Sequence, residues 1–167
     1  MNILKVGDKV SDFSSLDQHN NTIKLTDFSG KKLIVFFYPR ANTPGCTAQA
    51  CNLRDSYGDL IKEGYSLLGV SADSIKHQKN FSDKFNFPFS LLSDTDHTVI
   101  NIFGVWGPKK FRGKEYDGIN RITFVINENG AAAAGNRYAD DVVLPSRIGI
   151  LRPYSGTCVL DNENGVV

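Results

Sequence analysis

The sequence predicts an α/β fold in which helices flank a central β-sheet. Residues 33–38 form a continuous apolar run between turn signals, which is typical of a strand buried on both faces. Strand-like and helix-like segments then alternate along the chain, as in layered α/β proteins. These two observations place the first buried strand early in the chain and the helices after it.

The elements follow one another at short intervals. Turn residues at 20–22 and 29–31 flank a short early strand. Residues 47–63 carry apolar side chains at helical spacing, and Gly64 is placed to end that helix. We expect further strands at 65–71, 87–92 and 121–126, and further helices at 74–85 and 98–103.

The sequence Asn-Glu-Asn-Gly at 127–130 predicts a hairpin turn after the last of these strands. A β-α-β segment followed by a hairpin fits a thioredoxin-like fold with a central mixed β-sheet. We expect residues 1–130 to form this domain. We expect residues 131–167 to be a C-terminal segment of the same domain. This segment is atypical because Pro145, Pro153 and Gly156 argue against one long closing helix.

Composition excludes several classes of function. The chain has 167 residues, enough for one domain, and a net charge of +1, which favours neither nucleic acid nor an anionic membrane. A small basic cluster around 109–114 reads as a solvated loop or hairpin. No apolar run approaches the ~20 residues that span a bilayer. The three cysteines and the absence of a leader pattern at the N-terminus predict a cytoplasmic protein with reduced thiols.

Cys46 is the strongest candidate for chemistry. It follows the strand at 33–38 across a short loop containing Pro39, Thr43 and Gly45, where a helix is expected to begin. Unpaired N–H groups and the helix dipole at such a position favour the thiolate, which is the reactive form of cysteine. The alternative is that Cys46 is a small buried apolar residue.

The residues around Cys46 resemble the peroxiredoxin family. The pattern Pro39-x-x-x-Thr43-x-x-Cys46 matches its active-site motif. The longer stretch, with Phe-Tyr-Pro at 37–39, Asn-Thr-Pro-Gly-Cys-Thr at 42–47 and then Cys51, resembles the bacterioferritin comigratory protein subfamily. Matches continue in the same order to about Gly130, including Gly-Val-Ser-Ala-Asp-Ser at 69–74, Phe-Gly-Val-Trp at 103–106 and Arg-Ile-Thr-Phe-Val-Ile at 121–126. The resemblance implies a thioredoxin-like fold.

The same resemblance implies a thiol-dependent peroxidase that reduces hydrogen peroxide and organic hydroperoxides and is reset by a thioredoxin-type donor. Cys46 would attack the peroxide, and Arg121 would provide fixed positive charge beside the sulfur. Thr43 would also be catalytic, because its hydroxyl would donate or accept a hydrogen bond at the peroxide. Substrate binding would involve Pro39, Thr43, Gly45 and Arg121. No cofactor and no metal are implied, because the sulfur carries the redox chemistry.

The second cysteine, Cys51, is expected to resolve the oxidised Cys46 as a disulfide, with a buried helix residue as the alternative. We expect Cys158 to be a bystander thiol, with a secondary resolving role left open. The spacing of Cys46 and Cys51 and the scattered histidines argue against zinc. A non-catalytic redox sensor or holdase is the alternative function. A monomer is expected rather than an oligomer.

Overall fold

The computed structural model describes residues 3–111, 113–136, 142–143 and 150–151. Its main sheet has seven strands in the order β2-β1-β5-β4-β3-β8-β9. These strands are β1 (Ser14–Asp17), β2 (Thr22–Lys24), β3 (Lys32–Phe37), β4 (Tyr65–Ser71), β5 (Ser90–Ser93), β8 (Thr123–Ile126) and β9 (Ala132–Asn136). β3 pairs in parallel with β4, and β4 with β5, whereas β3 and β8 are antiparallel. The predicted mixed sheet is therefore confirmed.

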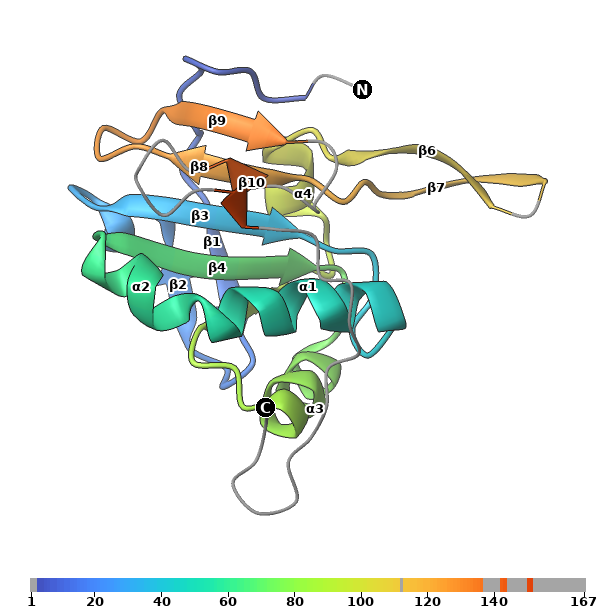
Figure 1. The fold of residues 1–167 in the computed structure, drawn as a ribbon. Coiled ribbons are helices and arrows are strands. Elements are labelled where there is room, and N and C mark those ends of the chain that lie inside the picture. Colours follow the sequence, from blue (N-terminus) through green and yellow to red (C-terminus); the bar gives the residue numbers. More distant parts are fainter. Residues whose placement is uncertain (1–2, 112, 137–141, 144–149, 152–167) are drawn as a thin grey trace.

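The remaining elements lie around this sheet. They are the 3-10 helix η1 (Leu25–Phe28), the helices α1 (Pro44–Asp55), α2 (Tyr57–Lys62), α3 (Ile75–Phe85) and α4 (Thr98–Ile102), the hairpin strands β6 (Trp106–Phe111) and β7 (Lys114–Ile119), and the short pair β10 (Val142–Val143) and β11 (Ile150–Leu151). α1 and α2 cover one face of the sheet, and the β6–β7 hairpin projects from the body (Figure 1). Every helix in the described ranges is too short or too polar to cross a membrane.

The predicted helix at 47–63 differs from the observed helices at its start and near its middle. α1 begins earlier, at Pro44, because proline suits the first helical turn, where no intrahelical N–H bond is required. Ser56 separates α1 from α2, although the Leu60 N–H still donates to the Ser56 carbonyl at 3.0 Å. Gly64 ends this region with a positive φ of 80°, as expected for a residue that follows a helix.

The strand predicted at 87–92 starts too early. β5 begins only at Ser90, because Pro88 has no N–H to donate to a ladder and the Phe87 N–H returns to the Ser82 carbonyl of α3 at 3.2 Å. The strand predicted at 121–126 likewise starts at Thr123, so Arg121 lies just before β8. These shifts leave the order of the elements unchanged.

The turn at 127–130 forms as predicted and joins β8 to β9. The Gly130 N–H donates to the Asn127 carbonyl at 2.9 Å, and Gly130 has a φ of 75°. The Asn127 side chain accepts from the N–H groups of Asn129 and Ala131. β9 then becomes the edge strand of the main sheet. The division at 130 between domain and atypical segment stays a prediction, and most of 131–167 lies outside the described residues.

Alternation along β3 divides the core into two layers. Ile34 and Phe36 face the layer that also contains Leu53 of α1 and Phe81 of α3. Leu33, Val35 and Phe37 face the other layer, which packs against α4 and is formed with residues such as Val99, Ile100 and Phe103. Both faces of β3 are thus buried, which explains its continuous apolar sequence.

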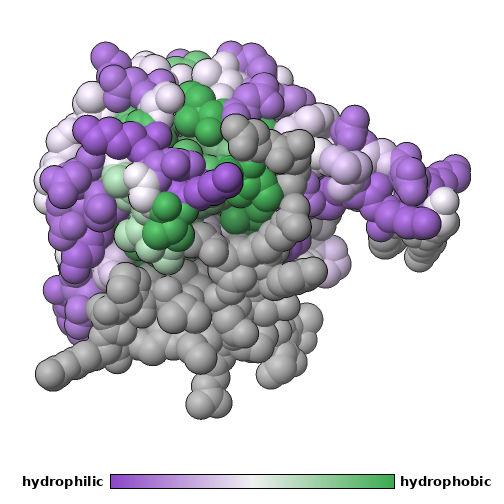
Figure 2. Space-filling model, turned by 90° about the horizontal axis from the view of Figure 1, so that it is seen from above, coloured by the Kyte–Doolittle hydropathy of each residue, from purple (hydrophilic) through white to green (hydrophobic). Residues whose placement is uncertain are grey.

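The basic cluster around 109–114 was predicted to be a loop or a hairpin, and its described residues lie in the β6–β7 hairpin. Lys109 pairs with Tyr116 and Lys110 with Glu115 across this hairpin. Figure 2 shows the projecting arm as largely hydrophilic. This agrees with a solvated hairpin for most of the cluster, with Lys109 as an exception described below.

Gly69 in β4 allows the closest packing in the buried sheet. A Cβ added there would lie 2.6 Å from Leu91 Cδ2 and 2.7 Å from Phe36 Cζ. We expect Gly69→Ala to lower the free energy of unfolding by about 1–3 kcal/mol, because overpacking displaces both side chains. Gly58→Ala in α2 is the matched control, since its added Cβ meets nothing within 4 Å. Urea unfolding of both variants tests this, and equal midpoints would contradict it.

Candidate active site

Cys46 lies in the first turn of α1, directly beyond the end of β3. Thr43 is the N-cap, with extended φ and ψ of −88° and 150°, and Pro44 occupies the first helical position. The Thr47 N–H donates to the Thr43 carbonyl at 2.9 Å, which closes the first turn. Cys46 is a free cysteine, and only 1% of its surface is exposed. The strand, loop and helix predicted around this cysteine are therefore present.

Arg121 reaches the sulfur of Cys46 from the segment just before β8, the strand that neighbours β3. Its Nη2 donates to Cys46 Sγ at 3.2 Å, and its Nη1 donates to the Gly45 carbonyl at 3.3 Å. β8 runs antiparallel to β3, so the start of β8 lies beside the end of β3, and the Phe37 N–H donates to the Ile122 carbonyl. This pairing brings a residue 75 positions away in sequence to the thiol.

Gln49 holds the guanidinium in place, and sequence reasoning missed it. Arg121 Nη1 donates to Gln49 Oε1 at 2.7 Å. Gln49 Nε2 is 3.5 Å from Thr123 Oγ1 on β8, at the outer limit of a hydrogen bond. Gln49 follows Cys46 by three residues in a helix, so the two side chains share a face. That spacing was the available signal, and only the position of Arg121 gives it a role.

Gly45 allows this close approach. A Cβ at position 45 would lie 3.3 Å from Arg121 Nη2, tighter than ordinary van der Waals contact. The residue before Cys46 must therefore be small for the guanidinium to bind the sulfur and the Gly45 carbonyl together. The structure thus brings Cys46, Gly45 and Arg121, three of the expected site residues, into contact.

Thr43 and Pro39 lie in the loop that leads into α1. Thr43 Oγ1 donates to the Arg40 carbonyl at 2.9 Å and makes no side-chain cap to the amides of α1. Pro39 is half-buried and follows the fully buried Tyr38. Burial raises the pKa of Tyr38 well above its ordinary value, so this phenol stays neutral.

Lys109 is a second cation facing this region. Its Nζ donates to the Ile119 carbonyl at 2.7 Å. The aliphatic part of the Lys109 side chain lies over Gly118, because a Cβ added there would be 3.3 Å from Lys109 Cδ. Burial and then the charge of Arg121 lower the pKa of Lys109, whereas Cys46 acts in the opposite direction. Lys109 is therefore half-buried, unlike the exposed Lys110 and Lys114 of the same hairpin.

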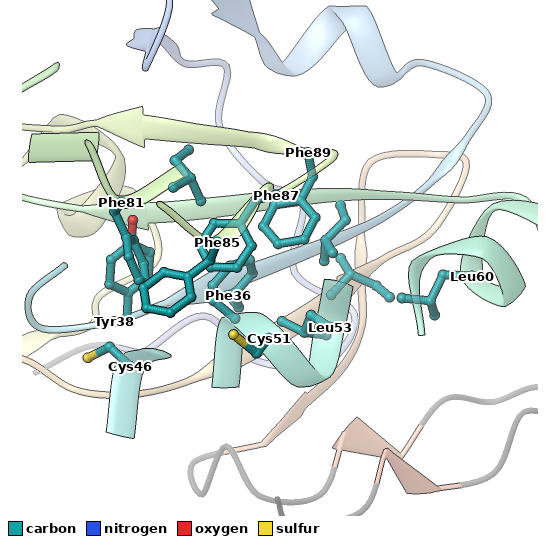
Figure 3. Close-up of a cluster of buried hydrophobic side chains, with 14 of the residues drawn as sticks. Phe36, Tyr38, Cys46, Cys51, Leu53, Leu60, Phe81, Phe85, Phe87 and Phe89 are labelled. Atoms are coloured by element: carbon teal, nitrogen blue, oxygen red, sulfur yellow. The ribbon is translucent and has the colours of Figure 1, made fainter. Parts of the chain in front are cut away.

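Cys51 lies later in α1, buried in the same layer of the core as Cys46. It is 1% exposed and disulfide-bonded in the structure, whereas Cys46 is free. Figure 3 shows Cys46 beside Tyr38 near the start of the helix and Cys51 further along, towards Leu53. Cys158 lies outside the described residues. Within the described part of the chain, His, Cys, Asp and Glu form no group of three that could hold a metal ion.

The Arg121 contact makes a testable prediction about Cys46. Replacing Arg121 with Met removes a hydrogen bond to a charged donor, worth about 1.5–3 kcal/mol. We expect Cys46 in the reduced protein to be alkylated by iodoacetamide roughly 10–100 times more slowly at neutral pH. The measurement is mass spectrometry of the Cys46 peptide over time.

Arg54→Met is the matched control for this variant. Arg54 also belongs to the site's helix, but it binds Asp55 and the Phe85 carbonyl at the far end of α1. It should leave the alkylation rate of Cys46 unchanged. Equal rates in the two variants would show that Arg121 has no specific effect on the sulfur.

Comparison with known proteins identifies the family. Residues 6–134 match the model of the AhpC/TSA family. The chain is 52% identical over 130 residues to a putative peroxiredoxin bcp of Haemophilus influenzae, covering 78% of this chain and 84% of the relative. It is 51% identical over 130 residues to peroxiredoxin Bcp of Escherichia coli strain K12, covering 78% and 83%.

Solved structures agree with these relatives. A structure of the Xanthomonas campestris bacterioferritin comigratory protein, whose description concerns alkyl peroxide reduction, superposes with a TM-score of 0.73 at 31% identity and covers 82% of this chain and 87% of the other. The fold is therefore the thioredoxin-like fold expected above. The chain belongs to the AhpC/TSA family and is a peroxiredoxin of the bacterioferritin comigratory protein subfamily, a thiol-dependent peroxidase.

Proposed function

We propose that Cys46 is the peroxidatic cysteine and that it reduces hydrogen peroxide and organic hydroperoxides. The observation that carries this assignment is the Arg121 guanidinium, which donates to the Cys46 sulfur at 3.2 Å. A positive charge at this distance stabilises the anionic sulfur by Coulomb attraction, and the thiolate is the nucleophile. The description of the solved Xanthomonas campestris relative supports alkyl peroxides as one substrate class.

The first step forms one bond and breaks one. The Cys46 thiolate attacks one peroxide oxygen, an S–O bond forms, and the O–O bond breaks with both its electrons leaving on the second oxygen. That oxygen takes up a proton and departs as water or an alcohol, and Cys46 becomes a sulfenic acid. Negative charge therefore moves from sulfur to oxygen, and fixed donors beside the sulfur stabilise it during the transfer.

The loop before α1 supplies the contacts for the peroxide. The N–H groups of Gly45 and Cys46 belong to the first turn of α1, where a helix leaves its amides free to bind an anion. The Thr43 proton is committed to the Arg40 carbonyl, so its oxygen is oriented to accept a bond from the O–H of the peroxide. Pro39 and Arg121 complete the proposed substrate site.

Once its own disulfide has been reduced, Cys51 is proposed to resolve the sulfenic acid by forming a disulfide with Cys46 and releasing water. The two residues are five apart in an intact α1. Five helical residues rise ~7.5 Å and turn ~140° from the start, whereas a disulfide needs Cα atoms within roughly 7 Å and converging side chains. The first turns of α1 must therefore unwind before the bond can form.

A thioredoxin-type dithiol is proposed to reduce this disulfide and restore both thiols. Because the cycle consumes reducing equivalents, it fits a reducing compartment such as the cytoplasm.

We also propose that the chain acts as a monomer. Among the described residues, the large apolar side chains that are exposed lie on separate segments of the chain and not in one run that a second copy could cover. They are Val6, Leu16, Ile61 and Tyr116. Sedimentation velocity of the reduced protein tests this, and a stable dimer would contradict it.

The decisive experiment is peroxide consumption coupled to a thioredoxin system, starting from protein fully reduced with dithiothreitol. We expect Cys46→Ser to abolish turnover. Cys51→Ser should slow turnover while still allowing one peroxide to oxidise Cys46, because resolution follows the first step. Sustained turnover also distinguishes the enzyme from a non-catalytic sensor.

Cys158→Ser tests whether the third cysteine takes part, and under this proposal the reduced variant should turn over at the wild-type rate. Full turnover in Cys51→Ser would assign resolution to another thiol. Wild-type protein should also lose helical circular dichroism on oxidation, because α1 unwinds. A stable sulfenic acid on Cys46 beside a reduced Cys51 would exclude the proposed resolving step.

A further inference from the structure

A buried polar network lies beside the loop that carries the active site. Gln78 of α3 and Ser71 of β4 are both fully buried. The Tyr38 hydroxyl donates to Gln78 Oε1, and Gln78 Nε2 donates to Ser71 Oγ at 2.9 Å and to the Leu92 carbonyl at 2.7 Å. Tyr38 is the residue with which the chain leaves β3 towards Cys46. The network thus joins the ends of three neighbouring strands to the start of the loop.

Asp73 connects this network to the loop itself. Its Oδ2 accepts from Ser71 Oγ at 2.7 Å and from the Ala41 backbone N–H at 2.7 Å. The Asp73 side chain is only 10% exposed. Hydrogen bonds from N–H or O–H donors to a carboxylate are short and strong, and partial burial strengthens them further. One carboxylate oxygen therefore holds a backbone position in the middle of the active-site loop.

The His77 side chain near Asp73 does not explain this arrangement. His77 Nδ1 is 3.9 Å from Asp73 Oδ1, and its side chain is 62% exposed. An exposed pair at this distance contributes little. The short contacts of the carboxylate are instead those to Ala41 and Ser71, so its best-defined partner away from the end of β4 is the loop.

Ala41 is well placed to control the geometry around Cys46. The next residue, Asn42, has a positive φ of 60°, and Thr43 Oγ1 donates back to the Arg40 carbonyl. The loop thus turns sharply at the residues that flank Ala41 before Pro44 begins α1. Releasing the Ala41 N–H would free this turn, and with it the direction of Thr43 and of the first amides of α1.

Resting on the role of Cys46 proposed above, we propose that Asp73 is a positioning residue that holds the Ala41 amide and thereby aligns the Thr43 hydroxyl and the start of α1 with the Cys46 sulfur. Asp73 touches neither the sulfur nor the peroxide. Its effect falls on the first step, for which the loop must be in place. The later disulfide step needs the start of α1 to unwind, so losing the Asp73 contact does not slow it.

The test measures the two steps separately in the reduced full-length chain. Dimedone trapping and mass spectrometry follow oxidation of Cys46 by hydrogen peroxide, and quenched samples without dimedone follow disulfide formation. Because the lost bond involves a charged acceptor, we expect Asp73→Ala to slow oxidation of Cys46 by roughly 10-fold or more. The rate from sulfenic acid to disulfide should stay equal to wild type or increase.

Three further variants separate positioning from general stability. Asp73→Asn keeps an acceptor oxygen for Ala41 and should recover most of the oxidation rate. Asp73→Ser provides a second test should the alanine variant fail to fold, because its shorter hydroxyl keeps a partner in Ser71 without reaching Ala41. Ser93→Ala is the control, since Ser93 Oγ donates to the Asp73 carbonyl at 2.8 Å and does not contact the loop.

Wild-type oxidation rates in both Asp73→Ala and Asp73→Ser would overturn the proposal. An equal loss of rate in Ser93→Ala would also overturn it, because the effect would then reflect stability of the region. If hydrogen peroxide fails to oxidise Cys46 in the wild-type protein, the proposed function itself fails, and the role of Asp73 fails with it.

Discussion

The antiparallel pairing of β3 with β8 is the constraint on which the active site depends. β3 leads into the loop and helix that carry Cys46. The residues just before β8 place Arg121 at the same end of these two strands. Neither segment can shift by one residue without reversing its side chains between the two core layers. The distance between guanidinium and sulfur is therefore fixed by the packing of both faces of the sheet.

The two core layers make this register rigid. Aromatic side chains fill the layer beneath α1, where Phe36 stacks with Tyr38 and Tyr38 contacts Phe81. Phe37 and Phe124 meet edge to face in the opposite layer. Because β3 and β8 both contribute to these contacts, displacing Arg121 from the sulfur would require repacking of buried rings.

The loop between β3 and α1 is held differently from the strands. Tyr38 and Ala41 anchor it in the apolar core, and polar contacts hold the rest, because Asp73 accepts from the Ala41 N–H and Thr43 donates to the Arg40 carbonyl. The exposed bond from Thr43 to Arg40 can be exchanged for bonds to water at small net cost, whereas the largely buried Asp73 contact and the buried apolar side chains cannot be exposed so cheaply. The division suits a thiol peroxidase of the proposed kind, which needs an ordered loop for the first step and a loosened α1 for the second.

The sequence by itself determined the strand, loop and helix that place Cys46 in the first turn of α1, because apolar periodicity, Pro44 and Gly64 act over a few neighbouring residues. Arg121 opens an otherwise apolar strand, which by itself leaves catalysis and pairing with a carboxylate equally open, and the family motif favoured catalysis. Only the tertiary structure decided that Gln49 holds Arg121, that the charge of Lys109 acts on Arg121 and Cys46, and that Asp73 reaches Ala41. These contacts join residues from different strands and helices, so they depend on strand order and register, which local sequence patterns do not specify.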